Sequence, residues 1–141
     1  MRKILDTVSA VTLGLLLMVS VGASAQDEEV VETEDLVYVD LRPTFISNYA
    51  RGTRLKYLKT DIALRVTRDR EDTVLYHLAY IRNALVMLLS EQEEENLTST
   101  LGKEVLRREA LDEVKRVMSY LEPGSASDIR EIYFTSFIVQ Q

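Results

Sequence analysis

The sequence predicts an α+β fold in which a small antiparallel sheet, made of a β-hairpin and a C-terminal strand, packs against two α-helices. Apolar and polar residues alternate between residues 36 and 68, and apolar residues recur every three or four positions between residues 69 and 121. The last twelve residues are rich in β-branched and aromatic types, which favour strands. The chain has 141 residues, enough for one domain, which we expect at residues 36–141.

Residues 1–25 have the composition of a secretory signal peptide or of an N-terminal membrane anchor. Arg2 and Lys3 form a basic start, residues 8–21 form an apolar run, and Ala23–Ala25 has the small-x-small pattern of a cleavage site. A membrane-spanning helix needs about 20 apolar residues, and the run is shorter than this unless the small residues are counted. Both alternatives place the remaining chain outside the cytoplasm. We therefore expect either a single span in the inner membrane with a periplasmic domain, or a soluble periplasmic protein cleaved after Ala25.

Residues 26–35 predict an acidic linker. The run DEEVVETED from Asp27 to Asp35 contains only two apolar residues, and its carboxylates repel one another. A metal site built from these carboxylates is the alternative, but solvated charge runs of this kind usually bind nothing.

Residues 36–49 and 54–68 predict the two strands of a hairpin, joined by the turn ARGT at residues 50–53. Pro43 marks a sheet edge or a bulge in the first strand because proline has no backbone N–H to donate. One face of the second strand carries Leu58, Ile62, Leu64 and Val66. The opposite face carries Lys59, Asp61 and Arg65, so we expect that face of the sheet to meet water.

Two helices are expected at residues 69–89 and 98–121. Asp69 is the expected N-cap of the first, and Ser90 with Glu93 has capping-box spacing that predicts a short helical turn between the two helices. The apolar stripe of the first helix contains Val74, Leu78, Ile81, Leu85 and Leu88. The stripe of the second contains Leu106, Ala110, Val114, Val117 and Leu121.

The final stretch, REIYFTSFIVQQ at residues 130–141, predicts a strand that is apolar on both faces. Strict alternation places Ile132, Phe134 and Ile138 on one face and Tyr133, Phe137 and Val139 on the other. Two helices can cover only one face of a small sheet, so one of these triplets stays exposed in an isolated monomer. We expect Tyr133, Phe137 and Val139 to form an interface with a partner; the alternative is that the acidic linker folds back over the exposed triplet.

The sequence contains little that points to catalysis or to a bound cofactor. His77 is the single histidine and there is no cysteine, so a thiolate metal site is excluded and a histidine metal site is disfavoured. Neither a phosphate-binding glycine loop nor a G-x-S-x-G motif occurs. The net charge of −6 disfavours nucleic-acid binding. We therefore expect a non-enzymatic interaction protein with no cofactor and no metal.

Four stretches together resemble the flagellar basal-body-associated FliL family. They are RLKYLKTDIALRV at residues 54–66, YIRNALVMLLSEQ at 80–92, LGKEVLRREALDEVKRVM at 101–118 and FTSFIVQ at 134–140. The aromatic-Thr-x-Phe strand near the end carries the most weight, and the helix start at Gly102-Lys103-Glu104 adds to it. The resemblance covers most of the chain after the leader, in the same order as in the family.

That resemblance implies a stomatin-like periplasmic domain behind one membrane span. It implies assembly into homo-oligomeric rings around the stator units of the flagellar motor, where the protein supports rotation, swimming or swarming. Two features depart from the family: the leader resembles a cleavable one, which suggests a periplasmic paralogue, and Lys115 stands where the family often has Asn. The alternative function is a stomatin-like periplasmic scaffold unrelated to flagella.

Overall fold

The computed structural model describes residues 34–49 and 56–140, which form one two-layer domain. Its elements are β1 (Leu36–Asp40), β2 (Phe45–Tyr49), β3 (Lys56–Thr67), α1 (Glu71–Tyr76), α2 (Leu78–Ser90), α3 (Glu94–Thr98), α4 (Thr100–Leu121) and β4 (Ile129–Gln140). Two 3-10 turns, Arg68–Arg70 and Ser125–Asp128, precede α1 and β4. The predicted leader, most of the predicted linker and the predicted hairpin turn lie outside the described residues.

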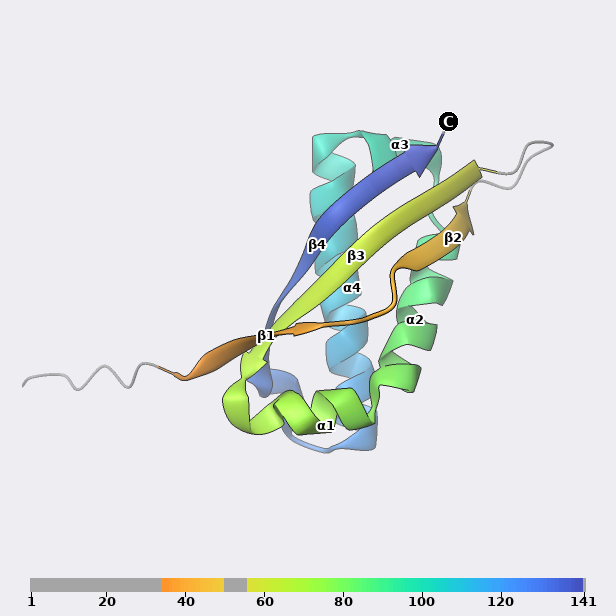
Figure 1. Ribbon diagram of the computed structural model, residues 1–141. Coiled ribbons are helices and arrows are strands. Elements are labelled where there is room, and N and C mark those ends of the chain that lie inside the picture. Colours follow the sequence, from red (N-terminus) through yellow and green to blue (C-terminus); the bar gives the residue numbers. More distant parts are fainter. Residues whose placement is uncertain (1–33, 50–55, 141) are drawn as a thin grey trace, which may run out of the picture. The chain divides into compact units, whose positions relative to one another are not determined.

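The sheet is antiparallel and is built around β3. Along one side of β3 lie β1 and β2, one after the other, and along its other side lies β4. Helices α2 and α4 lie side by side behind the sheet and cover one of its faces (Figure 1). The predicted α+β class, with a hairpin and a C-terminal strand packed on helices, is confirmed.

The core lies between the sheet and the helices, as predicted from the alternation of apolar residues in the strands and their spacing in the helices. Leu58, Leu64 and Val66 of β3 are fully buried, whereas Lys59 and Arg65 lie on the face that the helices leave open. The helices contribute Ile81, Leu85, Leu89, Leu106, Ala110, Val114 and Met118 to the same cluster. Burial of these side chains is the main favourable term that holds the two layers together.

The predicted first strand is in fact two strands, and this prediction was wrong. The chain leaves the sheet between Asp40 and Phe45, and Pro43 falls within this break. Arg82 of α2 stabilises the break, because its Nη1 donates hydrogen bonds to the carbonyl oxygens of Leu41 and Pro43, each at 2.5 Å. The guanidinium carbon of Arg82 also lies 4.0 Å from the centre of the Phe45 ring.

The predicted helix at residues 69–89 is likewise divided, at His77. The segments on either side of His77 are bent by 75° with respect to each other. At the joint, the His77 amide donates to the Thr73 carbonyl, while the His77 carbonyl accepts from the amide of Tyr80. Asp69 lies in the 3-10 turn before α1 and is therefore not an N-cap. The apolar spacing continues through the joint, so periodicity alone does not reveal it.

The short predicted helical turn exists as α3, but its capping differs from the prediction. α3 begins after Glu93, and the Ser90 hydroxyl donates instead to the Met87 carbonyl at 2.7 Å. The next helix, α4, is capped by Ser99, whose hydroxyl accepts a hydrogen bond from the Gly102 amide at 3.0 Å.

Candidate interaction surface

β4 forms one edge of the sheet. It pairs with β3 along its length, and no other described strand pairs with it. Its last nine residues, 132–140, include no charged residue, proline or glycine. Edge strands are commonly protected by charges, prolines or bulges that oppose pairing with another chain. In β4 this protection comes from two bulges, opposite Asp61/Ile62 and Arg65/Val66 of β3, and the first of them lies within the uncharged stretch.

That bulge is at Thr135. Ile62 of β3 pairs with Phe134, and the next residue, Asp61, pairs with Ser136, so Thr135 has no partner of its own. The buried hydroxyl of Thr60 donates to the Ser136 carbonyl at 2.6 Å and holds the strand in place after the bulge. One extra residue in a strand exchanges the faces of all residues beyond it.

The bulge corrects the predicted division of β4 into two triplets. Residues packed against the core, fully or in part, are Ile132, Phe134, Phe137 and Val139. Tyr133 and Ile138 lie on the opposite, open face, and Ile138 is 56% exposed. The predicted interface triplet therefore does not share one face: Phe137 and Val139 are half-buried on the helix side, and Tyr133 is on the open side. The role of these three residues in an interface stays a prediction.

Phe137 is nevertheless close to solvent at the edge of the sheet. Its ring centre lies 5.2 Å from that of Phe134, and the Lys103 ammonium of α4 lies 5.3 Å from the Phe137 ring centre. A cation over an aromatic face favours this ring position by electrostatic attraction. Phe137 thus belongs both to the margin of the core and to the accessible strand edge.

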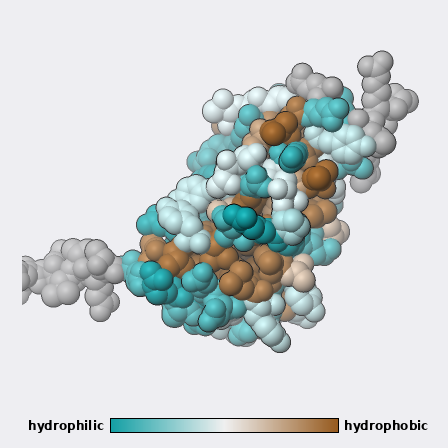
Figure 2. Space-filling model, in the orientation of Figure 1, coloured by the Kyte–Doolittle hydropathy of each residue, from teal (hydrophilic) through white to brown (hydrophobic). Residues whose placement is uncertain are grey.

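The open face of the sheet carries two apolar groups separated by polar residues. Tyr38 of β1 pairs with Arg65 and Tyr133 of β4 pairs with Ala63, the adjacent residue of this face on β3, and the two tyrosine ring centres lie 5.8 Å apart. In a second row across the sheet, Lys59 lies between Ile46 and Ile138. Figure 2 shows this side of the molecule, where hydrophobic and hydrophilic areas alternate. The apolar side chains of this face therefore form two small groups rather than one continuous patch.

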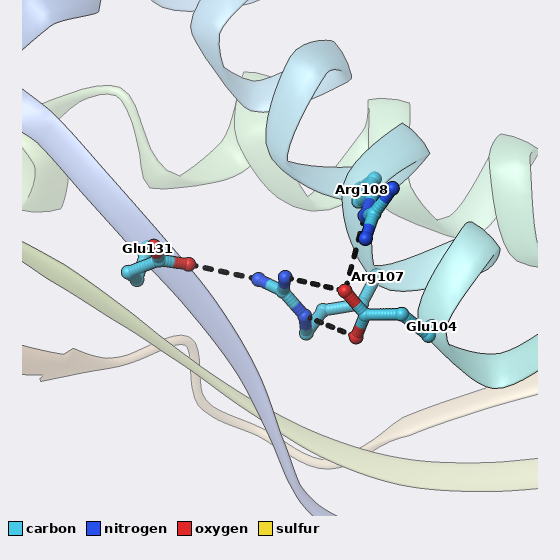
Figure 3. A network of polar contacts seen from close by, with 4 residues as sticks. All are labelled: Glu104, Arg107, Arg108 and Glu131. Carbon is cyan, nitrogen blue, oxygen red and sulfur yellow. Dashed lines mark hydrogen bonds and ion pairs between the residues drawn. The ribbon is translucent and has the colours of Figure 1, made fainter. Parts of the chain in front are cut away.

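An ion-pair network fixes the beginning of β4 to α4 (Figure 3). The Arg107 guanidinium donates to both carboxylate oxygens of Glu104 and to Glu131 of β4, each at 2.8 Å. Arg108 donates to the same Glu104 carboxylate at 3.1 Å. Hydrogen bonds from the two arginines lower the pKa of Glu104 to about 2. The end of β4 is held separately, because the Tyr49 hydroxyl donates to the Gln140 carbonyl at 2.9 Å.

His77, the one histidine, has a structural position. It is 8% exposed, and its Nε2 lies 2.9 Å from a carboxylate oxygen of Glu122 at the end of α4. Within residues 34–49 and 56–140, no group of three or more His, Cys, Asp or Glu side chains is placed to hold a metal ion. His77 therefore links the α1–α2 joint to the end of α4.

A hollow of about 490 Å³ lies at the break between β1 and β2. Both of its carboxylates already have partners. Asp61 accepts from the Thr44 hydroxyl at 2.6 Å, and Asp40 is paired with Arg42 at 3.1 Å. The polar side chains of this hollow are therefore hydrogen-bonded to one another.

No single helix in the described part of the chain is both long and apolar enough to cross a membrane. The bent pair formed by residues 68–76 and 78–90 passes that test, by length and composition only.

Comparison with known proteins gives consistent matches for the domain. The family model described as "Flagellar basal body-associated protein FliL" matches residues 38–140, which contain every strand and helix of the domain apart from the first two residues of β1. The "Flagellar protein FliL" of Aquifex aeolicus (strain VF5) is 30% identical over 101 residues, which cover 71% of this chain and 59% of the relative. The chain therefore spans less than two thirds of the length of that curated relative.

Proposed function

Because this chain belongs to the flagellar basal body-associated FliL family, we propose that it is a non-enzymatic accessory of the flagellar motor. In this role it associates with stator units and supports rotation during swimming or swarming. The observation that carries the proposal is the family match over residues 38–140, since it includes every helix and all of the sheet except the first two residues of β1.

We propose that the protein acts outside the cytoplasm and close to the inner membrane. Residues 1–25 serve either as the membrane span or as a cleaved leader, and the acidic linker at 26–35 joins them to the domain at 36–141. Mass spectrometry of the purified protein distinguishes the two forms, because a mature N-terminus at Gln26 requires cleavage. A chain that retains Met1 is anchored.

Self-association is the second part of the proposal, with the end of β4 as the contact. Ring assembly requires a surface that accepts another copy. The uncharged strand end supplies one, with Tyr133 and Ile138 on the open face and Phe137 and Val139 along the accessible edge. Because the chain is acidic, with a net charge of −6, copies approach each other most easily where neither presents charge.

Deletion of the gene tests the motor role. We expect filaments to assemble normally, while swimming speed and swarming under viscous load fall because the stator units are less well supported. Unchanged motility under load would refute the motor role. Co-purification with other membrane proteins but not with stator units would instead favour a stomatin-like scaffold unrelated to flagella.

A point substitution tests the strand contact separately from the fold. Ile138→Asp places a charge on a side chain that is 56% exposed, so the domain should stay folded by circular dichroism while its oligomers dissociate in light-scattering measurements. Leu101→Asp is the control, because Leu101 is 75% exposed and belongs to α4 rather than to the sheet. Oligomers that persist in Ile138→Asp would exclude the end of β4 as the contact.

A further inference from the structure

Helix α2 is apolar on nearly all sides, although only one side of it faces the core. Its buried side consists of Ile81, Leu85 and Leu89. Its one charged residue, Arg82, is directed to the carbonyl groups at the β1–β2 break. The opposite side is exposed and carries no charge, with Tyr80 at 63% and Met87 at 57% exposure. Helices that are hydrophobic all round are normally covered on all sides.

The exposed side of α2 forms a groove with α4. Two adjoining hollows, of about 310 and 290 Å³, share the lining residues Asn83 and Ala84 of α2 and Glu113 and Arg116 of α4. Along α2 the groove extends from Tyr80 to Glu91, which corresponds to about 16 Å, or three helical turns. An elongated groove of this length, between two parallel ridges of side chains, has the shape that accepts a third helix.

The two ends of the groove differ in chemistry. One hollow is aromatic and aliphatic, because Tyr80 faces Val117 and Tyr120 across it. The other contains Met87 and Glu91. Arg116 donates to Glu113 at 3.0 Å, which leaves Glu91 as the charged lining residue without an ion-pair partner among the described residues.

The free charge of the groove is thus negative. A negative site disfavours the surface of an anionic membrane and favours an apolar partner that carries basic residues.

We propose that this α2–α4 groove binds an amphipathic helix of a partner protein. The helix inserts apolar residues spaced i, i+3, i+4 and i+7 between Tyr80 and Met87, and places a lysine or arginine beside Glu91. The lining residues of the groove belong to α2 and α4, apart from Glu91 directly after α2, and none belongs to β4. The use of the groove therefore does not depend on the motor role or on contacts made by β4.

Two synthetic peptides of equal length and helicity test this proposal against the purified full chain. Both are about five turns long with leucines at i, i+3, i+4 and i+7; one carries lysines beside the leucine stripe and the other carries glutamates. We expect the lysine peptide to bind more tightly in fluorescence anisotropy. Met87→Glu should weaken its binding by about tenfold or more, as loss of a central apolar contact does.

Leu101→Glu is the matched control, because it adds the same charge to an exposed helix residue outside the groove and should leave binding unchanged. Glu91→Lys, also exposed, should reverse the preference between the two peptides. Circular dichroism verifies that each variant stays folded.

Four results would overturn the proposal. The first is equal binding of both peptides, and the second is equal loss in Met87→Glu and Leu101→Glu. The third is that the wild-type chain binds anionic lipid vesicles and Met87→Glu abolishes this binding, which would assign the groove to a membrane surface. Self-association that Met87→Glu abolishes would assign it to a second copy and would equally refute a partner helix. Motility of the deletion strain is measured separately. It tests the motor role, and its result does not bear on whether the groove binds a helix.

Discussion

Removing the Arg82 side chain should destabilise the domain, because Arg82 is the residue through which α2 holds the β1–β2 break. Its guanidinium donates to two backbone carbonyls, at Leu41 and Pro43, and lies 4.0 Å from the ring centre of Phe45. Burial lowers the pKa of this guanidinium, which shows that it is partly withdrawn from water.

A hydrogen bond from a charged donor contributes about 1.5–3 kcal/mol, and an exposed cation–π contact contributes about 0.5–1 kcal/mol. Water can reach the break and replace part of these contacts. We therefore expect Arg82→Met to lower the free energy of unfolding by about 2–3 kcal/mol. Arg82→Lys should recover less than half of this, because one ammonium cannot bridge both carbonyls and also lie flat on the ring.

Urea unfolding of the full chain, followed by far-UV circular dichroism, measures these differences. Arg42→Met is the matched control. Arg42 also lies at the break, but its side chain is 84% exposed and, within residues 34–49 and 56–140, pairs with Asp40 alone, so its loss should cost less than about 0.5 kcal/mol. If Arg82→Met and Arg42→Met unfold at the same urea concentration, Arg82 does not hold the break.

Two further substitutions test the start of α4. A Cβ added at Gly102 would lie 2.5 Å from the carbonyl oxygen of Asn96, so Gly102→Ala should lower the free energy of unfolding by about 1–3 kcal/mol despite the better helix propensity of alanine; an unchanged urea midpoint would contradict this. For Glu104, the folded-state pKa of about 2 lies below the ordinary 4.5, so its contribution is fully present above 4.5 and is lost as the pH falls through 2. Unfolding of wild type and Glu104→Gln should therefore differ at neutral pH and converge in acid, whereas a constant difference would show that Arg107 does not act through this charge.

The fold class could be predicted because, in the elements that form the core, apolar residues recur along the sequence at the same spacing as the residues that face the core. Each second residue of β3 from Leu58 to Val66 faces the helices, and no bulge on β3 interrupts this pattern. The stripes of α2 and α4 follow from helical spacing in the same way. These patterns depend only on neighbouring residues, which is why the sequence contains them.

The bulge at Thr135 could not be predicted, because it is a property of the pairing between two distant strands. Its position depends on Thr60 of β3, whose hydroxyl binds the Ser136 carbonyl. When both faces of a strand are apolar, the sequence does not show which residues face the helices; the pairing with the neighbouring strand decides this. The predicted interface was affected for this reason: the bulge moves Phe137 and Val139 to the side opposite Tyr133.

The joint at His77 was missed for a related reason. Apolar residues continue at helical spacing on both sides of it, and neither proline nor glycine marks the bend. The contact that accompanies the bend, between His77 and Glu122, joins residues 45 positions apart. The groove was missed as well, although the composition of α2 could have indicated it. Only one of its thirteen residues is charged, so the helix has more apolar surface than one side packed on the core can bury.

Charge separates the two free surfaces of the domain according to the partners they can accept. The open sheet face is formed by the strands and the α2–α4 groove by the two helices, so the two surfaces share no residue. The end of β4 has no charge of its own between residues 132 and 140, so a copy that meets this strand meets no charge on the strand itself. The groove has an unpaired carboxylate at Glu91, so two copies meeting there would bring like charges together, whereas a basic helix would gain an ion pair. If this separation holds, Ile138→Asp abolishes self-association and leaves binding of the lysine peptide unchanged, and Met87→Glu does the reverse. Loss of both properties in either variant would show that the two surfaces act as one site.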